Sequence, residues 1–171
     1  PALEDAELRG ALLAHRQLPA AARLTLVHAV ARKLAEARIV KGAVAPARLE
    51  RLLRNATDTA LTEIGEAEAA ASRTGYAVEL VTDERVSARV MLHAVVNGHV
   101  LFFADCLAEL AEAPREKVFT LLESGSRAAL NALLARCWLG EAVRNMVARL
   151  VFHARASDLA DDMAARHFVV T

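Results

Sequence analysis

The side chains with the clearest capacity for chemistry begin with His28, in the segment LTLVHAVARKLAEARI. The apolar residues of this segment have helical spacing, which predicts that His28 lies on the first long helix of a helical hairpin. The phosphoacceptor histidines of two-component dimerisation domains occupy the same kind of position. The residue after His28 is alanine, whereas typical kinase boxes have an acidic residue there. Two interpretations remain open, a phosphoacceptor and a histidine on the flank of an apolar stripe, and the second is favoured.

A second group of candidate ligands consists of His93, His99, Asp105 and Glu109. The two histidines are separated by a predicted helix break, and the two carboxylates stand one helical turn apart. A metal site needs three or four convergent ligands with supporting partners. This spacing predicts a solvated or hydrogen-bonded pair of histidines, and the sequence predicts neither a metal ion nor a cofactor.

The two cysteines, Cys106 and Cys137, occupy apolar helical positions and lack the close CxxC spacing that lowers a thiol pKa. We therefore predict that they are core residues. The segment Ser124-Gly125-Ser126 superficially resembles a phosphate-binding loop, but it follows a predicted helix and no lysine comes after it. A helix end followed by Ser126 as the N-cap of the next helix explains it better.

The adjacent pair Phe102-Phe103 cannot face one neighbour, because consecutive residues of a helix point about 100° apart. We expect one ring to lie in the core while the other contacts a second layer or a partner. If they are exposed, Phe103 and Trp138 are the candidate anchors of a protein interface, since aromatic residues dominate binding energies there. Burial in the core is the alternative for both.

Composition predicts an all-α fold. Among 171 residues alanine occurs 38 times, whereas aromatic residues make up 4% and glycine and proline are few. Acidic and basic residues both number 21, and division after Arg73 leaves both halves nearly neutral. Nucleic-acid binding usually needs a basic face, so we expect no nucleic-acid partner. The apolar runs are too short to span a bilayer, so we expect no membrane partner either.

The chain divides at Arg73-Thr74-Gly75 into predicted regions 1–73 and 74–171, and we expect the two regions to pack as one globular unit. The first region contains a short helix, Leu3–His15, and a long antiparallel hairpin of helices from Pro19 to about Lys41 and from Ala47 to about Ser72. Gly42 is expected to end the first arm, and Pro46 to open the second. Alanine-rich faces on the hairpin predict that it packs on the other region or on a second copy.

The second region is predicted to contain stacked short helix pairs, arranged as an α-solenoid or an irregular bundle. Its expected helices share an apolar residue at every third or fourth position. They are Tyr76–Val81, Val86–Val96, His99–Ala111, Arg115–Glu123, Ser126–Trp138 and Glu141–Ala154, followed by a segment of helical propensity.

A pattern in the second region resembles that of an uncharacterised alphaproteobacterial family of helical-repeat, HEAT-like domains. The matching residues are glycine, a phenylalanine pair, an ALAEL-like segment, a proline and a leucine-rich turn. They are Gly98, Phe102, Phe103, Leu107, Ala108, Glu109, Leu110, Pro114, Val118, Leu121, Leu122, Gly125, Ala129, Leu130, Leu133 and Arg136. His99 and Cys137-Trp138 depart from the pattern. The resemblance implies a helical fold in a bacterial cytoplasmic protein and supplies no catalytic residues.

Together these features predict a non-catalytic cytoplasmic scaffold or adaptor that binds another protein and can form a homodimer through the hairpin. The alternative is a histidine phosphotransfer module that uses His28. An enzyme is disfavoured, because no nucleophile with its base and no paired carboxylates are recognisable. The first residue is proline, which suggests a fragment of a longer protein.

Overall fold

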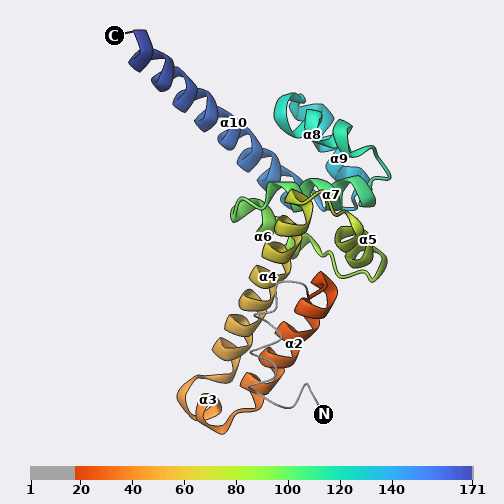
Figure 1. The fold of residues 1–171 in the computed structure, drawn as a ribbon, viewed down its shortest axis with the longest axis vertical. Helices are drawn as coiled ribbons and strands as arrows, with labels where there is room; N and C mark the ends of the chain where they lie inside the picture. The colour runs from red at the N-terminus through yellow and green to blue at the C-terminus, as the bar shows by residue number, and fades with distance from the viewer. Residues whose placement is uncertain (1–17, 171) are drawn as a thin grey trace. The chain divides into compact units, whose positions relative to one another are not determined.

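The computed structural model describes the backbone of residues 18–170 and the side chains of residues 18–38 and 40–156 (Figure 1). Within this range it contains nine α-helices and no strand, so the all-α prediction is confirmed. The predicted helix Leu3–His15 lies outside the described residues. The chain forms two compact units, Pro1–Tyr76 and Ala77–Thr171, with the division inside the helix that follows Arg73.

The first unit contains the predicted helical hairpin. Its two arms are α2 (Ala20–Glu36) and α4 (Pro46–Ala70), which pack along one another and are joined by the short helix α3 (Arg38–Ala43). Pro46 is the first residue of α4, as expected from its fixed φ and missing N–H.

The first arm differs from its prediction, because one continuous helix to Lys41 was expected. The backbone is extended at Ala37 (φ −63°, ψ 125°), and there α2 ends. The Ala37 N–H still donates to the carbonyl oxygens of Lys33 and Leu34, at 3.1 and 3.3 Å, which caps α2. Gly42 lies within α3 and does not end the arm as predicted.

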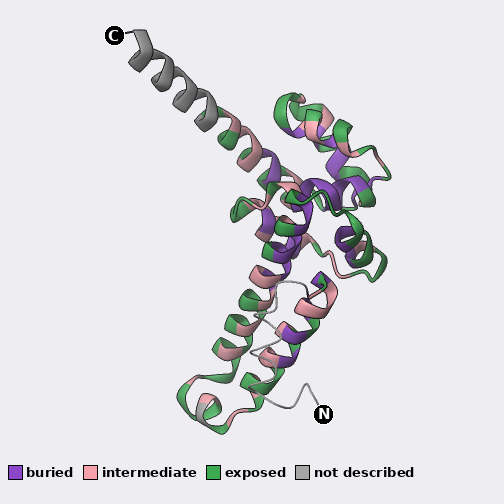
Figure 2. Ribbon diagram, viewed as in Figure 1, coloured by how far each residue is buried: buried purple, intermediate pink, exposed green. Residues whose placement is uncertain are grey.

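The core of the first unit is formed by one face of α2 and the C-terminal half of α4 (Figure 2). Leu24 and Leu26 of α2 and Leu61 and Ile64 of α4 are all less than a tenth exposed. The N-terminal half of α4 contributes no buried residue, and its Leu52 is 51% exposed. The hairpin is therefore well packed at the α4 C-terminus and open at its α3 end.

A charged cluster completes the packed end of the hairpin. Glu68 of α4 is buried and accepts hydrogen bonds from Arg23 Nη2 at 2.9 Å and from Arg73 Nε at 2.7 Å. The hydroxyl of Tyr76 donates to the carbonyl oxygen of Leu61 at 3.3 Å. These bonds fasten the chain after α4 back onto the hairpin.

The second unit contains helices close to the predicted ranges. The unit begins inside α5 (Gly75–Thr82) and continues with α6 (Ala88–Val96), α7 (Val100–Leu110), α8 (Arg115–Ser124), α9 (Arg127–Arg136) and α10 (Glu141–Val170). The last helix continues beyond the predicted Ala154. The predicted N-cap Ser126 is confirmed, since its Oγ accepts from the Ala129 N–H at 3.2 Å.

Consecutive helices of the second unit pack on one another from α6 to α10, and α10 also packs on α6. Helix α7 is the most buried element, with every residue from Phe102 to Ala108 buried. The other helices of this unit contribute apolar side chains that are almost completely buried, namely Met91, Val118, Leu130, Leu134 and Val147.

Three arginines bind carbonyl oxygens at or just beyond the C-terminal ends of α7, α8 and α9. Arg136 donates to Ala111 O at 2.5 Å and Arg144 to Leu139 O at 2.8 Å, and Arg155 donates to Leu121 and Leu122 of α8 and to its C-cap, Gly125. The last carbonyls of a helix lack intrahelical donors and carry partial negative charge, so a guanidinium both satisfies and neutralises them.

None of the helices in the described part of the chain has the length and apolar character needed to cross a bilayer.

Candidate functional site

The most unusual position in the second unit is Trp138, which follows the end of α9. Its φ is +59°, in the left-handed region. The Trp138 N–H donates to Ala135 O at 3.2 Å and the Leu139 N–H to Leu134 O at 3.4 Å, which together form a Schellman motif. Glycine is the usual residue at this position, because a side chain costs energy there.

The backbone on both sides of Trp138 is held in the core. Cys137 is 4% exposed and Leu139 is 6% exposed, whereas Trp138 itself is 90% exposed. The two buried neighbours fix the turn, so the indole projects from a defined backbone. An indole in this setting presents a large apolar surface and one N–H donor to whatever approaches it.

An open pocket of about 410 Å³ adjoins the indole. Its wall combines the ends of α7 and α9, which the bond from Arg136 to Ala111 O holds together at 2.5 Å. Glu112, at the end of α7, also has a positive φ, +47°. The lining residues are Leu110, Ala111, Glu112, Ala135, Arg136 and Trp138. The fixed turn, the exposed indole and the neighbouring hollow make this surface the candidate site.

The other candidate anchor, Phe103, is not exposed on the surface, which is the condition for it to anchor an interface. Phe102 and Phe103 are each 1% exposed, because α7 is covered on several sides and both of their directions lead into the core. Both rings therefore lie in the core, which is the alternative that the sequence left open, and of the two candidate anchors Trp138 lies on the surface.

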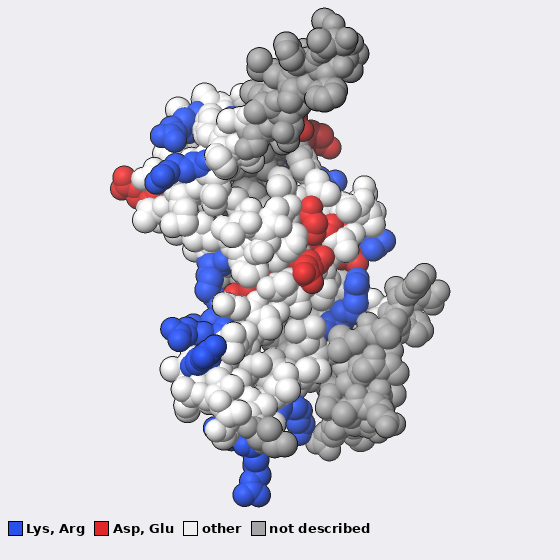
Figure 3. Space-filling model, turned by 90° about the vertical axis from the view of Figure 1, so that its left-hand side faces the viewer, with Lys and Arg blue, Asp and Glu red and all other residues white. Residues whose placement is uncertain are grey.

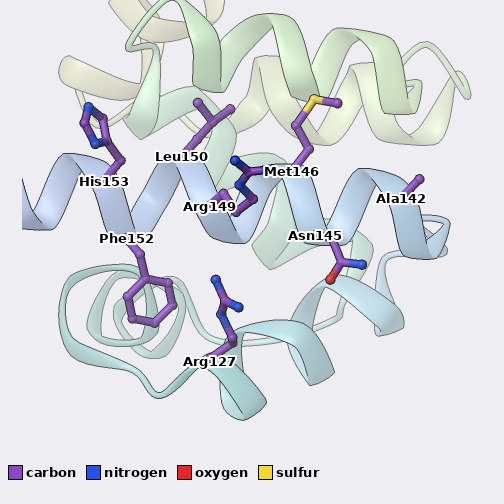
Figure 4. Close-up of a pocket in the computed structure, with 8 residues that line it drawn as sticks. All are labelled: Arg127, Ala142, Asn145, Met146, Arg149, Leu150, Phe152 and His153. Carbon is purple, nitrogen blue, oxygen red and sulfur yellow. The ribbon is translucent and has the colours of Figure 1, made fainter.

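A second open pocket, of about 590 Å³, lies between the start of α9 and α10 (Figure 4). Phe152 of α10 and Arg127 of α9 point toward one another, with the guanidinium carbon 5.7 Å from the ring centre. Arg155 lies over the same ring at 4.6 Å. The other lining residues are Ala142, Asn145, Met146, Arg149, Leu150 and His153. With two arginines and no carboxylate in its wall, this pocket favours anions, and nothing in the sequence pattern predicted it.

His28 is exposed on α2, and the following residue, Ala29, is buried. A phosphoacceptor needs an accessible ring, so this exposure meets one requirement of the phosphotransfer hypothesis. The acidic residue of typical kinase boxes is not supplied by the neighbouring position.

The remaining polar candidates do not converge. Asp105 is buried and accepts from Arg115 Nε at 2.5 Å, which ties α7 to α8. Glu109 is exposed, and the Nδ1 atom of His99 is buried without a hydrogen-bond partner. In the described part of the chain, no three His, Cys, Asp or Glu side chains lie close enough together to hold a metal ion.

The two cysteines are free and buried, as predicted for core residues. Burial raises the pKa of the Cys137 thiol to about 11, and burial with the nearby Asp105 raises the pKa of Cys106 further. The Cys137 thiol donates to the carbonyl oxygen of Leu133 at 3.4 Å. Thiols with raised pKa values are poor nucleophiles, so neither cysteine has the character of a catalytic residue.

Comparison with known proteins places the chain in a family. Residues 2–170 match the model of a family described as an uncharacterised protein conserved in bacteria (DUF2336), and the chain belongs to this family. No curated protein matches, and no solved structure matches.

Proposed function

We propose that this member of the DUF2336 family is a non-catalytic helical adaptor that binds another protein, with the indole of Trp138 as the anchor. The observation that carries the proposal is the combination of 90% exposure with a φ of +59° at a tryptophan. Tryptophan is enriched among the residues that contribute most to protein interfaces.

The energetics support this choice of anchor. A bulky residue in the left-handed region costs about 1–2 kcal/mol, and exposure leaves its apolar surface in water. The hydrogen bonds of the turn and its buried neighbours hold the backbone at Trp138, but no burial in the described chain offsets the exposure of the indole. Backbone strain of this kind tends to occur where a ligand or partner binds. A partner that covers the indole would supply the missing burial.

The partner is expected to be a protein with an apolar recess for the indole and a side chain that enters the hollow beside it. The pocket of about 410 Å³ next to Trp138 is of the size that receives one or two side chains. Arg136 and Glu112 at its edge supply opposite charges that would orient the partner.

Three finer features belong to the same proposal. Stacking of consecutive helices from α6 to α10 supports a HEAT-like helical repeat, although the contact of α10 with α6 also suits an irregular bundle. Self-association through the hairpin Pro19–Ser72 is supported by the exposed alanines of α4 that lie beyond its first turns, Ala56, Ala67 and Ala70. A bacterial cytoplasmic location is supported by two unpaired, buried cysteines.

The protein interaction is tested by quantitative capture of partners from native cells with the wild-type chain, Trp138→Ala and a control, Val96→Ser. Val96 is 65% exposed, so the control removes apolar surface elsewhere on the same unit. We expect the captured amount of at least one protein to fall about tenfold or more with Trp138→Ala and to stay unchanged with Val96→Ser. Identical sets of captured proteins would rule out Trp138 as the anchor.

The second candidate function is phosphotransfer through His28, for which the exposure of that residue is the favouring observation. It predicts acid-labile phosphate on His28 after incubation with a partner kinase. Retention of the phosphate by His28→Gln would place it elsewhere and end this hypothesis.

A further inference from the structure

The even charge of the whole sequence conceals a strongly basic segment at the α3 end of the hairpin. Residues 32–54, here called the basic turn, contain two acidic residues, Glu36 and Glu50, and seven basic ones. The basic residues are Arg32, Lys33, Arg38, Lys41, Arg48, Arg51 and Arg54. The counts of acidic and basic residues over each half of the chain do not reveal this segment, because acidic residues in the later part of α4 balance its basic ones.

Both acidic side chains of the basic turn are already paired. Glu36 lies 4.0 Å from Lys33 Nζ, and Glu50 forms an ion pair with Arg54. The other five cations are all exposed, and the described residues form no ion pair with them. Figure 3 shows basic side chains over the lower end of the molecule. Within the part of the chain that the structure describes, the basic turn therefore presents five cations that have no ion-pair partner.

Apolar side chains are exposed among these cations. Leu34 is 45% exposed and Leu52 is 51% exposed, and Val40, which precedes Lys41 in the sequence, is partly exposed. No aromatic residue occurs in the basic turn. Cations mixed with aliphatic side chains suit a surface that is anionic outside and apolar just beneath, which describes the headgroup region of a bilayer.

We propose that the basic turn docks the protein on the surface of an anionic lipid bilayer. The absence of a bilayer-crossing helix among the described ones concerns spanning, whereas this contact is peripheral. The arginines and Lys41 would lie against lipid phosphates while Leu34 and Leu52 enter the headgroup layer. The inference goes beyond the adaptor proposal and uses no residue of the Trp138 surface.

Two other occupants are less well matched. A second copy docking turn to turn would bring like charges together, which opposes association. A single-stranded nucleic acid usually stacks bases on aromatic rings, and the basic turn has none. Duplex DNA would use the cations but would leave Leu34 and Leu52 without an apolar partner, and it is an outcome of the test below.

The test is flotation of the full chain with vesicles of phosphatidylcholine alone and of phosphatidylcholine with about one third phosphatidylglycerol. Binding is expected only to the anionic vesicles, and it should weaken strongly between about 50 and 500 mM salt. Arg48→Gln with Arg51→Gln should reduce partitioning about thirtyfold, since each cation near such a surface contributes about 1 kcal/mol. Leu52→Ser should give a smaller loss.

The matched control is Lys117→Gln with Arg89→Gln, which removes two exposed cations from the second unit. It should bind within about twofold of the wild type, and all variants are first matched for helical circular dichroism and melting temperature. Equal binding to neutral vesicles, or equal losses in test and control variants, would overturn the proposal. So would tight binding to a duplex of about 20 base pairs by a chain that does not float with vesicles.

Discussion

Arg155 of α10 donates a hydrogen bond from Nε to the carbonyl oxygen of Leu122 in α8, at 2.7 Å. The same guanidinium donates to Gly125 O at 2.8 Å and to Leu121 O at 2.6 Å, and it lies over the ring of Phe152. One side chain thus satisfies the end of a helix that is remote in sequence, because the arginine fork offers several donors in fixed directions.

Replacement of Arg155 by alanine should lower the free energy of unfolding by about 2–3 kcal/mol, since charge-assisted bonds to partly buried carbonyls are lost. Arg155→Lys should recover only part of this, because an ammonium cannot reach three divergent acceptors. Urea unfolding, followed by circular dichroism, measures the free energy of unfolding of both variants. Arg149→Ala, an exposed position on the same helix, is the control and should change stability by less than about 0.5 kcal/mol. Equal effects of Arg155→Ala and Arg149→Ala would show that the capping bonds contribute nothing.

Gly125 should tolerate no side chain. A Cβ atom there would lie 2.5 Å from Leu121 O and 2.9 Å from Leu121 Cα, and both atoms belong to the backbone of α8. Gly125→Ala should therefore displace the end of α8 and cost about 1–3 kcal/mol. Gly140→Ala is the matched control, because its Cβ would meet nothing within 4 Å. The control should be neutral or slightly stabilising in the same unfolding assay, and an equally stable Gly125→Ala chain would contradict the expected clash.

The sequence predicted helix starts better than helix ends. Pro46 and Ser126 mark starts through local chemistry that needs no tertiary structure, and both predictions hold. The break at Ala37 was missed because neither glycine nor proline marks it. Left-handed ends at Ser72, Glu84, Glu112 and Trp138 were missed for a related reason, since the sequence signal for that conformation is glycine or asparagine.

The candidate sites depended still more on tertiary structure. Whether Phe103 or Trp138 reaches the surface follows from how α7 and α9 are covered, and helical periodicity alone left both possibilities open. The arginine contacts to helix ends could not be foreseen, because a long side chain on α10 must meet a carbonyl on α8. The basic turn, by contrast, is visible in the sequence when charge is counted over a short window.

Glu68 should make the stability of the first unit depend on pH. The hydrogen bonds and charge of Arg73, with a smaller effect of Arg23, lower the pKa of Glu68 in the folded chain below its ordinary 4.5, although burial opposes them. A carboxyl with a depressed folded pKa stabilises the fold fully above its unfolded pKa. This contribution is lost as the pH falls below about 4.5 toward the lower folded pKa.

The measurement for Glu68 is the free energy of unfolding from pH 7 to pH 3 for the wild type, Glu68→Gln and Glu63→Gln. Glu68→Gln should show a shallower decline below pH 4.5 and lower stability at pH 7, because the two arginines lose their carboxylate. Glu63→Gln, an exposed change on the same helix, should follow the wild type. Parallel curves for wild type and Glu68→Gln would contradict the assigned role.

The cysteines should react slowly with thiol reagents in the folded chain. Both are buried, and burial raises the pKa of Cys137 to about 11, so little thiolate forms at pH 8. In denaturant both thiols of each chain should react rapidly with an aromatic disulfide reagent, as measured by absorbance. Without denaturant almost no reaction should be seen. Rapid modification of either thiol in the native chain would show that the α7–α9 contact opens readily.

Trp138 offers a way to separate stability from binding. Trp138→Gly removes the indole and also the steric cost of the left-handed backbone, so it should leave the free energy of unfolding unchanged or raise it by up to about 1 kcal/mol. Trp138→Ala removes the same indole but retains a Cβ in the strained conformation, so it should be less stable than the glycine variant. Both variants should lose the partner captured by the wild type. If Trp138→Gly were strongly destabilised, the indole would serve the fold. If both variants retained every partner, its exposure would serve no interface on this surface.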